Sequence, residues 1–163
     1  MSEPVRIWLE ISHHAAFRVG GWAGVRADGV AVTGSAGGER RIDAERTALA
    51  GLAAALKSPA APRPTRLFTS SDLVAAIPAR IRAAQEGEGA PTENLDLWAQ
   101  VMTALAPGVI RIVQVARTPG TPSAFAAAWA ELGRDRVKDK GPFTAPIPKS
   151  SLAKAGIDAV SQS

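Results

Sequence analysis

Apolar and polar positions alternate at the start of the chain, over residues 5–12, and this period-two pattern predicts a β-strand. One face of that strand would carry four aliphatic side chains: Val5, Ile7, Leu9 and Ile11. The opposite face would carry Trp8 and Glu10, so a carboxylate stands inside an otherwise apolar run. Two interpretations follow for Glu10: it is a metal ligand, or it is the remainder of a site that once held a metal.

The same patterns predict four more strands and four helices along the chain. The strands are expected within residues 21–27, 30–37, 65–72 and 107–116. The helices are expected near residues 44–58, from Asp72 onward, over 95–106 and within 119–137. The order βββ-α-β-α-α-β-α predicts an α/β fold with a mixed five-stranded sheet. Three antiparallel strands would precede the parallel ones, and helices would cover both faces.

The periodic pattern ends near residue 137, which predicts a domain over residues 1–137 and a tail over residues 138–163. The tail contains proline and serine and has no clear period, so we expect it to be flexible or docked on the domain. From Arg134 onward there are six basic and three acidic residues, which accounts for +3 of the net charge of +4. The rest of the chain is therefore nearly neutral.

Composition narrows the class of protein. The 163 residues suit one domain, and 46% of them are hydrophobic, which is enough for a core. Cysteine is absent and no run of 18 apolar residues occurs, so we expect a cytoplasmic protein without disulfides and without a membrane partner. Abundant alanine, and arginine in excess of lysine, give the impression of a bacterial source. The pI of about 10.1 permits a polyanionic partner.

Short sequence motifs, called words below, carry a family resemblance. They include E-I-S at the end of the first strand, R-T-A-L on the first helix, T-S-S after the fourth strand and N-L-D-L-W at the start of a later helix. These words occupy residues 10–12, 46–49, 69–71 and 94–98, and further matches lie at 20–24, 115–122 and 128–131. In this order the chain resembles bacterial-type ribonuclease H, a member of the RNase H-like superfamily, over about residues 5–137.

The resemblance implies a chemistry and also a departure from it. RNase H cleaves the RNA strand of an RNA–DNA hybrid with two Mg²⁺ ions, which activate a water and stabilise the leaving oxygen. The family holds these ions with four carboxylates, and the corresponding positions here are Glu10, Ala48, Ser70 and Ala128. A single carboxylate remains, so the resemblance implies a degenerate active site and no resident metal.

Displaced carboxylates offer an alternative, in which the protein is an active RNA–DNA hybrid endoribonuclease dependent on Mg²⁺ or Mn²⁺. Glu45, Asp72 and Glu131 lie near the lost positions in sequence and would join Glu10, with Glu10 and Asp72 as metal ligands. Three helical residues shift the attachment point by about 4.5 Å, whereas the two ions lie only about 4 Å apart. Each of the three also has an ordinary explanation as a helix-terminal or solvated acid.

Nucleic-acid binding does not require the metal ligands. Small side chains at Ser12 and Ser71 would let phosphates approach, and Arg18, Arg46 and Arg117 would supply positive charge. We therefore expect, first, a nucleic-acid-binding pseudo-nuclease whose partner is an RNA–DNA hybrid or RNA. The nearly neutral domain predicts weak, salt-sensitive binding.

A third hypothesis has no role for nucleic acid. The alanine-rich helix carries Phe125 and Trp129, whose rings would form a surface for a homodimer or another protein partner.

Overall fold

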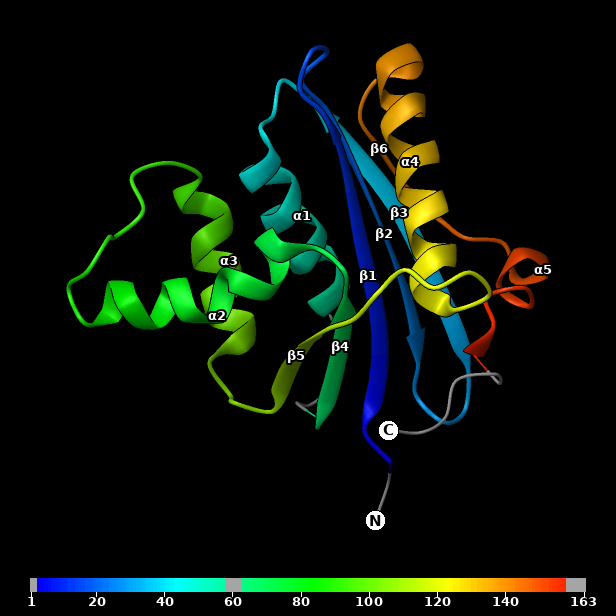
Figure 1. The fold of residues 1–163 in the computed structure, drawn as a ribbon, viewed down its shortest axis with the longest axis horizontal. Helices are drawn as coiled ribbons and strands as arrows, with labels where there is room; N and C mark the ends of the chain where they lie inside the picture. Colours follow the sequence, from blue (N-terminus) through cyan, green and yellow to red (C-terminus); the bar gives the residue numbers. More distant parts are fainter. Residues whose placement is uncertain (1–2, 58–62, 158–163) are drawn as a thin grey trace.

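A single six-stranded sheet organises the chain, which a computed structural model describes for residues 3–57 and 63–157 (Figure 1). The strands are β1 (Val5–His14), β2 (Val19–Ala27), β3 (Val32–Arg40), β4 (Thr65–Thr69), β5 (Ile110–Gln114) and β6 (Phe143–Pro146). The helices are α1 (Ala44–Leu56), α2 (Asp72–Gln85), α3 (Leu95–Leu105), α4 (Pro122–Lys140) and α5 (Lys149–Leu152). None of these helices is both long enough and apolar enough to cross a membrane.

The sheet order is β5-β4-β1-β2-β3-β6. β1, β2 and β3 form an antiparallel meander, while β4 pairs parallel to β1 and β5 parallel to β4. The predicted mixed sheet is therefore confirmed. Strands that run parallel need a crossover connection: α1 lies in the connection from β3 to β4, and α2 and α3 lie in the connection from β4 to β5.

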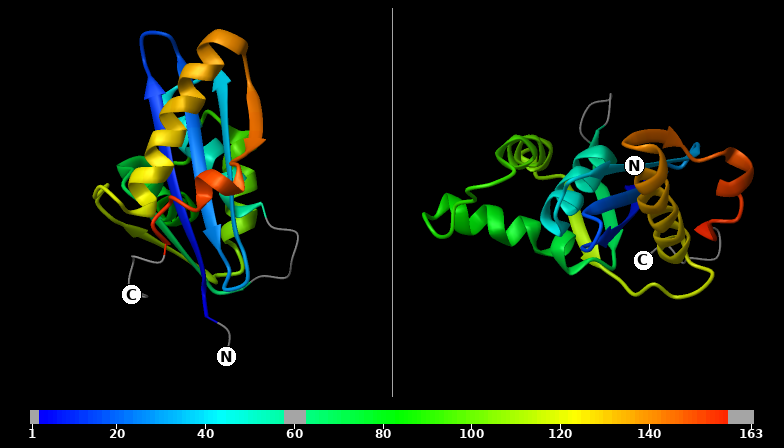
Figure 2. Two further views of the ribbon diagram at one scale, coloured as in Figure 1. Left: turned by 90° about the vertical axis from the view of Figure 1, so that its right-hand side faces the viewer. Right: turned by 90° about the horizontal axis from the view of Figure 1, so that it is seen from above.

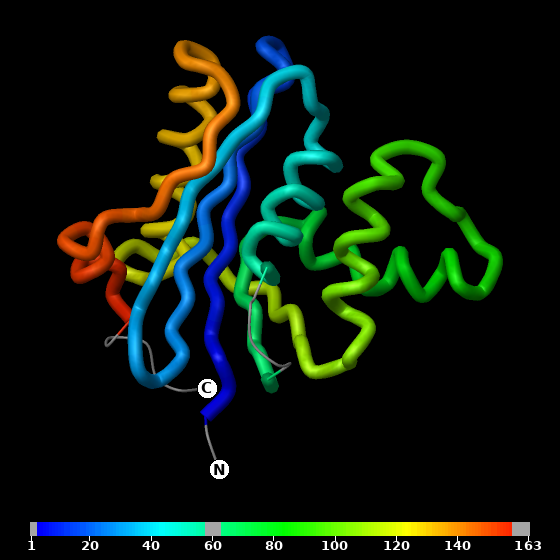
Figure 3. The backbone as a smooth tube through the Cα atoms, turned by 180° about the vertical axis from the view of Figure 1, so that it is seen from behind, coloured from blue at the N-terminus to red at the C-terminus, as the bar shows by residue number. Residues whose placement is uncertain are grey.

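The number of strands was predicted wrongly, because the sheet has six and not five. β6 pairs antiparallel with the outer edge of β3 and lies within the segment predicted as a tail; Figure 3 shows the two side by side. α4 also runs three residues beyond the expected end of the domain. A four-residue edge strand next to prolines has no readable period, which is why the sequence pattern missed it. The last six residues of the tail lie outside the described part of the chain.

Helices cover both faces of the sheet, as predicted (Figure 2). α1, α2 and α3 pack on one face, where Val5, Ile7 and Leu9 of β1 join the larger core cluster. α4 packs on the other face, over β1, β2 and β3. Glu10 points to the α4 side, opposite the aliphatic stripe, and this placement follows directly from the period-two alternation along β1.

Two adjacent glycines let α1 and α4 approach β2 from opposite faces. A Cβ at Gly20 would clash with Oγ1 of Thr47 on α1, and a Cβ at Gly21 would clash with the backbone nitrogen of Arg134 on α4. Larger residues at these positions would push the helices away from the sheet. The close packing of α4 on β2 positions the first turn of this helix, which contributes a side chain to the site around Glu10.

Candidate functional site

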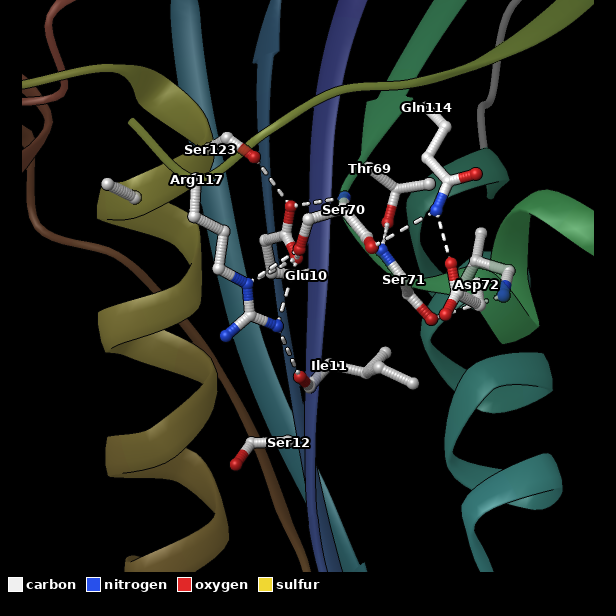
Figure 4. Close-up of polar contacts among 12 residues, drawn as sticks. Glu10, Ile11, Ser12, Thr69, Ser70, Ser71, Asp72, Gln114, Arg117 and Ser123 are labelled. Atoms are coloured by element: carbon white, nitrogen blue, oxygen red, sulfur yellow. Dashed lines mark hydrogen bonds and ion pairs between the residues drawn. The ribbon is translucent and has the colours of Figure 1, made fainter. Parts of the chain in front are cut away.

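Glu10 lies in the middle of β1 with no exposed surface, and its carboxylate accepts hydrogen bonds from three neighbours (Figure 4). Oε2 accepts from the backbone nitrogen of Ser70 at 2.8 Å and from Oγ of Ser123 at 2.6 Å. Oε1 accepts from Oγ of Ser70 at 2.5 Å. A buried carboxylate needs such donors, because a charge removed from water without partners is strongly unfavourable.

Arg117 completes this environment from the side that faces solvent. Its Nη2 lies 3.2 Å from Oε1 of Glu10, and its Nε donates to Oγ of Ser70 at 2.6 Å. The same guanidinium also donates to the backbone carbonyl of Ile11 at 3.4 Å. The Arg117 side chain is 42% exposed, whereas Glu10 is fully enclosed. The negative charge of Glu10 is therefore neutralised by an arginine at the surface end of a buried polar cluster.

The cluster joins four separate segments of the chain. Glu10 comes from β1, and Ser70 directly follows the last residue of β4. Arg117 comes from the connection between β5 and α4, and Ser123 from the first turn of α4. We call these four residues the Glu10 cluster. It fastens the β5–α4 connection and the start of α4 to the centre of the sheet.

The four family positions inferred from the sequence do not all meet in the structure. Ser70 does lie beside Glu10, and Ala48 on α1 is buried in the larger core cluster. Ala128, however, lies on the exposed side of α4. Ser123 is the α4 residue that contacts Glu10, and it lies in the first turn of the helix, after Thr121 as N-cap and Pro122 at the first position.

The displaced carboxylates are held by other partners. Glu45 accepts from Nδ2 of Asn94 at 2.9 Å and pairs with Arg80. Burial alone would raise the pKa of Glu45, but the hydrogen bonds from Arg80 and Asn94 outweigh it and lower that pKa. Asp72, in the first turn of α2, is contacted by the side-chain amide of Gln114. Both acids therefore have structural roles at helix starts.

The acids predicted to form a displaced site do not meet. Glu131 is exposed on α4, and the described residues contain no group of three or more acidic, histidine or cysteine side chains placed to hold a metal. A Mg²⁺ ion prefers several hard oxygen ligands in octahedral geometry. One carboxylate whose oxygens already accept from two serines and an arginine does not fit a two-metal site.

Most of the predicted phosphate contacts have partners within the protein. Oγ of Ser12 accepts from Arg134 at 2.9 Å, and Ser71 caps α2 by accepting from the backbone nitrogen of Val74. Arg18 is exposed on the turn between β1 and β2, where its φ of 51° is left-handed. Ser12 on β1, Ser71 at the start of α2 and Arg18 on the β1–β2 turn therefore belong to three separate elements.

Arg46 is bound within the structure as well. Its guanidinium makes two hydrogen bonds to the carboxylate of Asp96, at 3.0 and 3.1 Å, and also contacts Glu39. The hydrogen bond from Arg46 lowers the pKa of the Asp96 carboxyl, and the same bond raises that of Arg46. Asp96 belongs to the N-L-D-L-W word, so this word contributes to the docking of α3 on α1.

The aromatic pair on α4 is partly covered by the chain itself. The rings of Phe125 and Trp129 lie 6.2 Å apart and pack against the smaller core cluster, which includes Ile147 and Leu152 of the C-terminal segment. The surface predicted for a homodimer or protein partner is therefore in part an internal contact.

Comparisons with solved structures identify the fold, whereas comparisons of the sequence find no match. No protein-family profile matches the chain, and no curated protein matches it. LC9-RNase H1, a type 1 RNase H with the type 2 active-site motif, superposes with a TM-score of 0.69 at 16% identity, covering 95% of this chain and 86% of that one. The N-terminal RNase H domain of rv2228c from Mycobacterium tuberculosis gives 0.58 at 22% identity, covering 82% and 95%. RNase H1 from the archaeon Halobacterium salinarum gives 0.56 at 21%, covering 81% and 98%.

These likenesses show that the protein has an RNase H-like fold. The identities are too low to carry an activity from those proteins to this one, because a fold can host unrelated functions. The function must be argued from the Glu10 cluster.

Proposed function

We propose that the protein is an RNase H-like pseudo-nuclease, which binds an RNA–DNA hybrid or RNA and does not cleave it by metal-dependent hydrolysis. The observation that carries the proposal is the ion pair between Glu10 and Arg117. The buried carboxylate of Glu10 needs a positive charge nearby, and the side chain of Arg117 supplies that charge in place of a metal ion.

The hydrogen bonds of Glu10 support a structural role. Each of its oxygens already accepts from at least one serine donor, and Oε1 also faces the guanidinium. A metal ion would have to displace Arg117 and leave that arginine and the serines to find other partners. Such a rearrangement costs free energy, because removing one member of a buried charged pair is strongly destabilising.

The surrounding positions support the same conclusion. Where the family resemblance implies acids, Ser70 provides a hydroxyl group and Ala48 and Ala128 provide no ligand at all. Ser123 adds a second hydroxyl group beside Glu10. Hydroxyl groups donate to a carboxylate, whereas additional carboxylates would repel it unless cations were present. The Glu10 cluster is therefore self-consistent as a metal-free arrangement.

Nucleic-acid binding is supported by the RNase H-like fold and by a pI of about 10.1. Binding of this kind depends mainly on lysine and arginine contacts to phosphates, so it should weaken steeply as salt increases. The hybrid is the first substrate to test, since the similar solved structures are RNases H.

The experiment combines binding with cleavage. A fluorescein-labelled RNA–DNA hybrid is titrated with the protein at low and at moderate salt, and the same complex is incubated with Mg²⁺ and with Mn²⁺. The proposal expects salt-dependent binding and an intact RNA strand. No binding at low salt would exclude the nucleic-acid role, and cleavage that Glu10→Gln abolishes would establish an active nuclease instead.

A further inference from the structure

Three arginines stand in register across neighbouring parallel strands. Arg6 of β1 is paired with Arg66 of β4, and Arg66 is paired with Arg111 of β5. Neighbouring strands lie about 4.8 Å apart, so the three side chains leave the sheet as one row. We call these residues the arginine row.

The arginine row lies on the same face of the sheet as α4. Leu67 and Ile112, the next residues along β4 and β5, belong to or pack against the core under α1, α2 and α3. Side chains alternate along a strand, so Arg66 and Arg111 point to the other side. α4 packs over β1, β2 and β3 (Figure 2), and Arg66 and Arg111 are both exposed. Within the described residues, this face is therefore open to a ligand at these two arginines.

The charges of the arginine row are not balanced within the described residues, where no ion pair joins any of the three to an acid. Nη1 of Arg6 is buried and has no hydrogen-bond partner among the same residues. Like charges directly opposite on paired strands are destabilising, and a buried donor without an acceptor is costly. An anion bound over the row would offset the repulsion among the three charges.

An aromatic pair lies directly beside the arginine row. Trp8 and Phe68 occupy the next positions on this face, in register with each other, and their rings are stacked with centroids 5.5 Å apart. Trp8 is buried, whereas Phe68 is half-buried. Proteins that bind single-stranded nucleic acid combine two features: basic side chains that contact successive phosphates, and an aromatic ring on which a base stacks.

We propose that the arginine row and Phe68 form a binding site for single-stranded nucleic acid, with phosphates on Arg66 and Arg111 and a base against Phe68. This proposal rests on the proposed nucleic-acid function. It adds the surface on which the nucleic acid binds and states that the bound strand is single-stranded. Arg6 precedes Glu10 by four residues on the same face of β1, a distance of about 13 Å along the strand. A single strand can therefore reach from the arginine row to Arg117.

The test uses a fluorescein-labelled 15-nucleotide uridine RNA and fluorescence anisotropy, with salt concentration as the second variable. The double variant Arg66→Glu/Arg111→Glu should weaken binding by at least about tenfold. It should also flatten the slope of log K against log salt by about 1.4, because two phosphate contacts are lost and each contributes about 0.7 on a single strand. A merely structural defect would not change that slope, and the conservative variant Arg66→Lys/Arg111→Lys should retain the wild-type slope.

The matched control is Arg41→Glu/Lys154→Glu, which changes two exposed residues outside the open face by the same total charge. It should weaken binding less than about threefold, with little effect on the slope. Equal losses in both double variants would mean that net charge alone drives binding, and would overturn the site. Wild-type binding that the arginine-row variant does not weaken would overturn the site but leave the proposed function standing. No wild-type binding of RNA or hybrid would overturn both.

Discussion

Nη2 of Arg117 lies 3.2 Å from Oε1 of Glu10, although 107 residues separate the two in the chain. This ion pair closes the solvent side of a carboxylate that is otherwise enclosed by protein. It links the β5–α4 connection to β1, and it places a positive charge beside Glu10, the acidic residue of that strand. The stability and the chemistry of the site should both depend on it.

Removal of the arginine should destabilise the fold. Arg117→Met leaves the buried carboxylate of Glu10 without its cation, and we expect a loss of about 2 kcal/mol, moderated because the arginine is partly exposed. Glu10→Gln/Arg117→Met should recover part of that loss, since the amide carries no charge. Urea unfolding of the two single variants and the double variant measures the coupling, and additive effects would show that the pair contributes nothing specific.

The hydroxyl of Ser123 should contribute to the same cluster. Ser123→Ala removes a hydrogen bond to a buried charged group, and we expect a loss of about 1.5–3 kcal/mol in the free energy of unfolding. Ser150→Ala, at an exposed position on α5, serves as the control and should change stability by less than about 0.5 kcal/mol. A Ser123 variant as stable as the Ser150 variant would contradict the geometry around Glu10.

Glycine at position 21 should be required for the docking of α4. Gly21→Ala places a Cβ against the backbone of Arg134, so the helix must move, and we expect a loss of about 1–3 kcal/mol. Gly24→Ala lies on the same strand with its nearest contact at 3.8 Å, and it should be tolerated. Thermal unfolding compares the two, and equal midpoints would show that α4 does not press on β2 at Gly21.

Glu45 should make stability dependent on acid pH. Its pKa in the folded protein is lowered from the ordinary value of 4.5, mainly by Arg80 and Asn94 against the opposing effect of burial. The stabilisation is therefore fully present above pH 4.5 and is lost as pH falls through the lower folded value. Glu45→Gln should reduce the loss of stability over this acid range, as measured by urea unfolding at several pH values. An unchanged pH profile would contradict the assigned partners.

Much of the fold was readable from the sequence because its signals are local and periodic. The alternation along β1 placed Glu10 opposite the aliphatic stripe. Serine and aspartate are typical N-cap residues, and in the structure Ser71 caps α2 and Asp43 caps α1. β6 was missed because four residues on a sheet edge are fixed by pairing with β3 and not by their own pattern.

The candidate site was harder to predict, since its contacts join distant segments. Ser70 lies beside Glu10, Ser123 was not among the residues inferred from the sequence, and Ala128 is exposed on α4. The local signal was present, because Thr121 followed by Pro122 is typical of a helix start. The role of Arg117 as the partner of Glu10 depends on the path of the β5–α4 connection, which no local pattern encodes.

The most direct measurement of the central claim is a cleavage time course on a labelled RNA–DNA hybrid, performed with hybrid shown to be bound and with Mn²⁺ present. The Glu10–Arg117 pair predicts that the RNA strand stays intact while the complex persists, in the wild type and in Glu10→Gln alike. Cleavage by the wild type that requires Mn²⁺ and disappears in Glu10→Gln would contradict it, because Glu10 would then be a metal ligand and not the partner of an arginine.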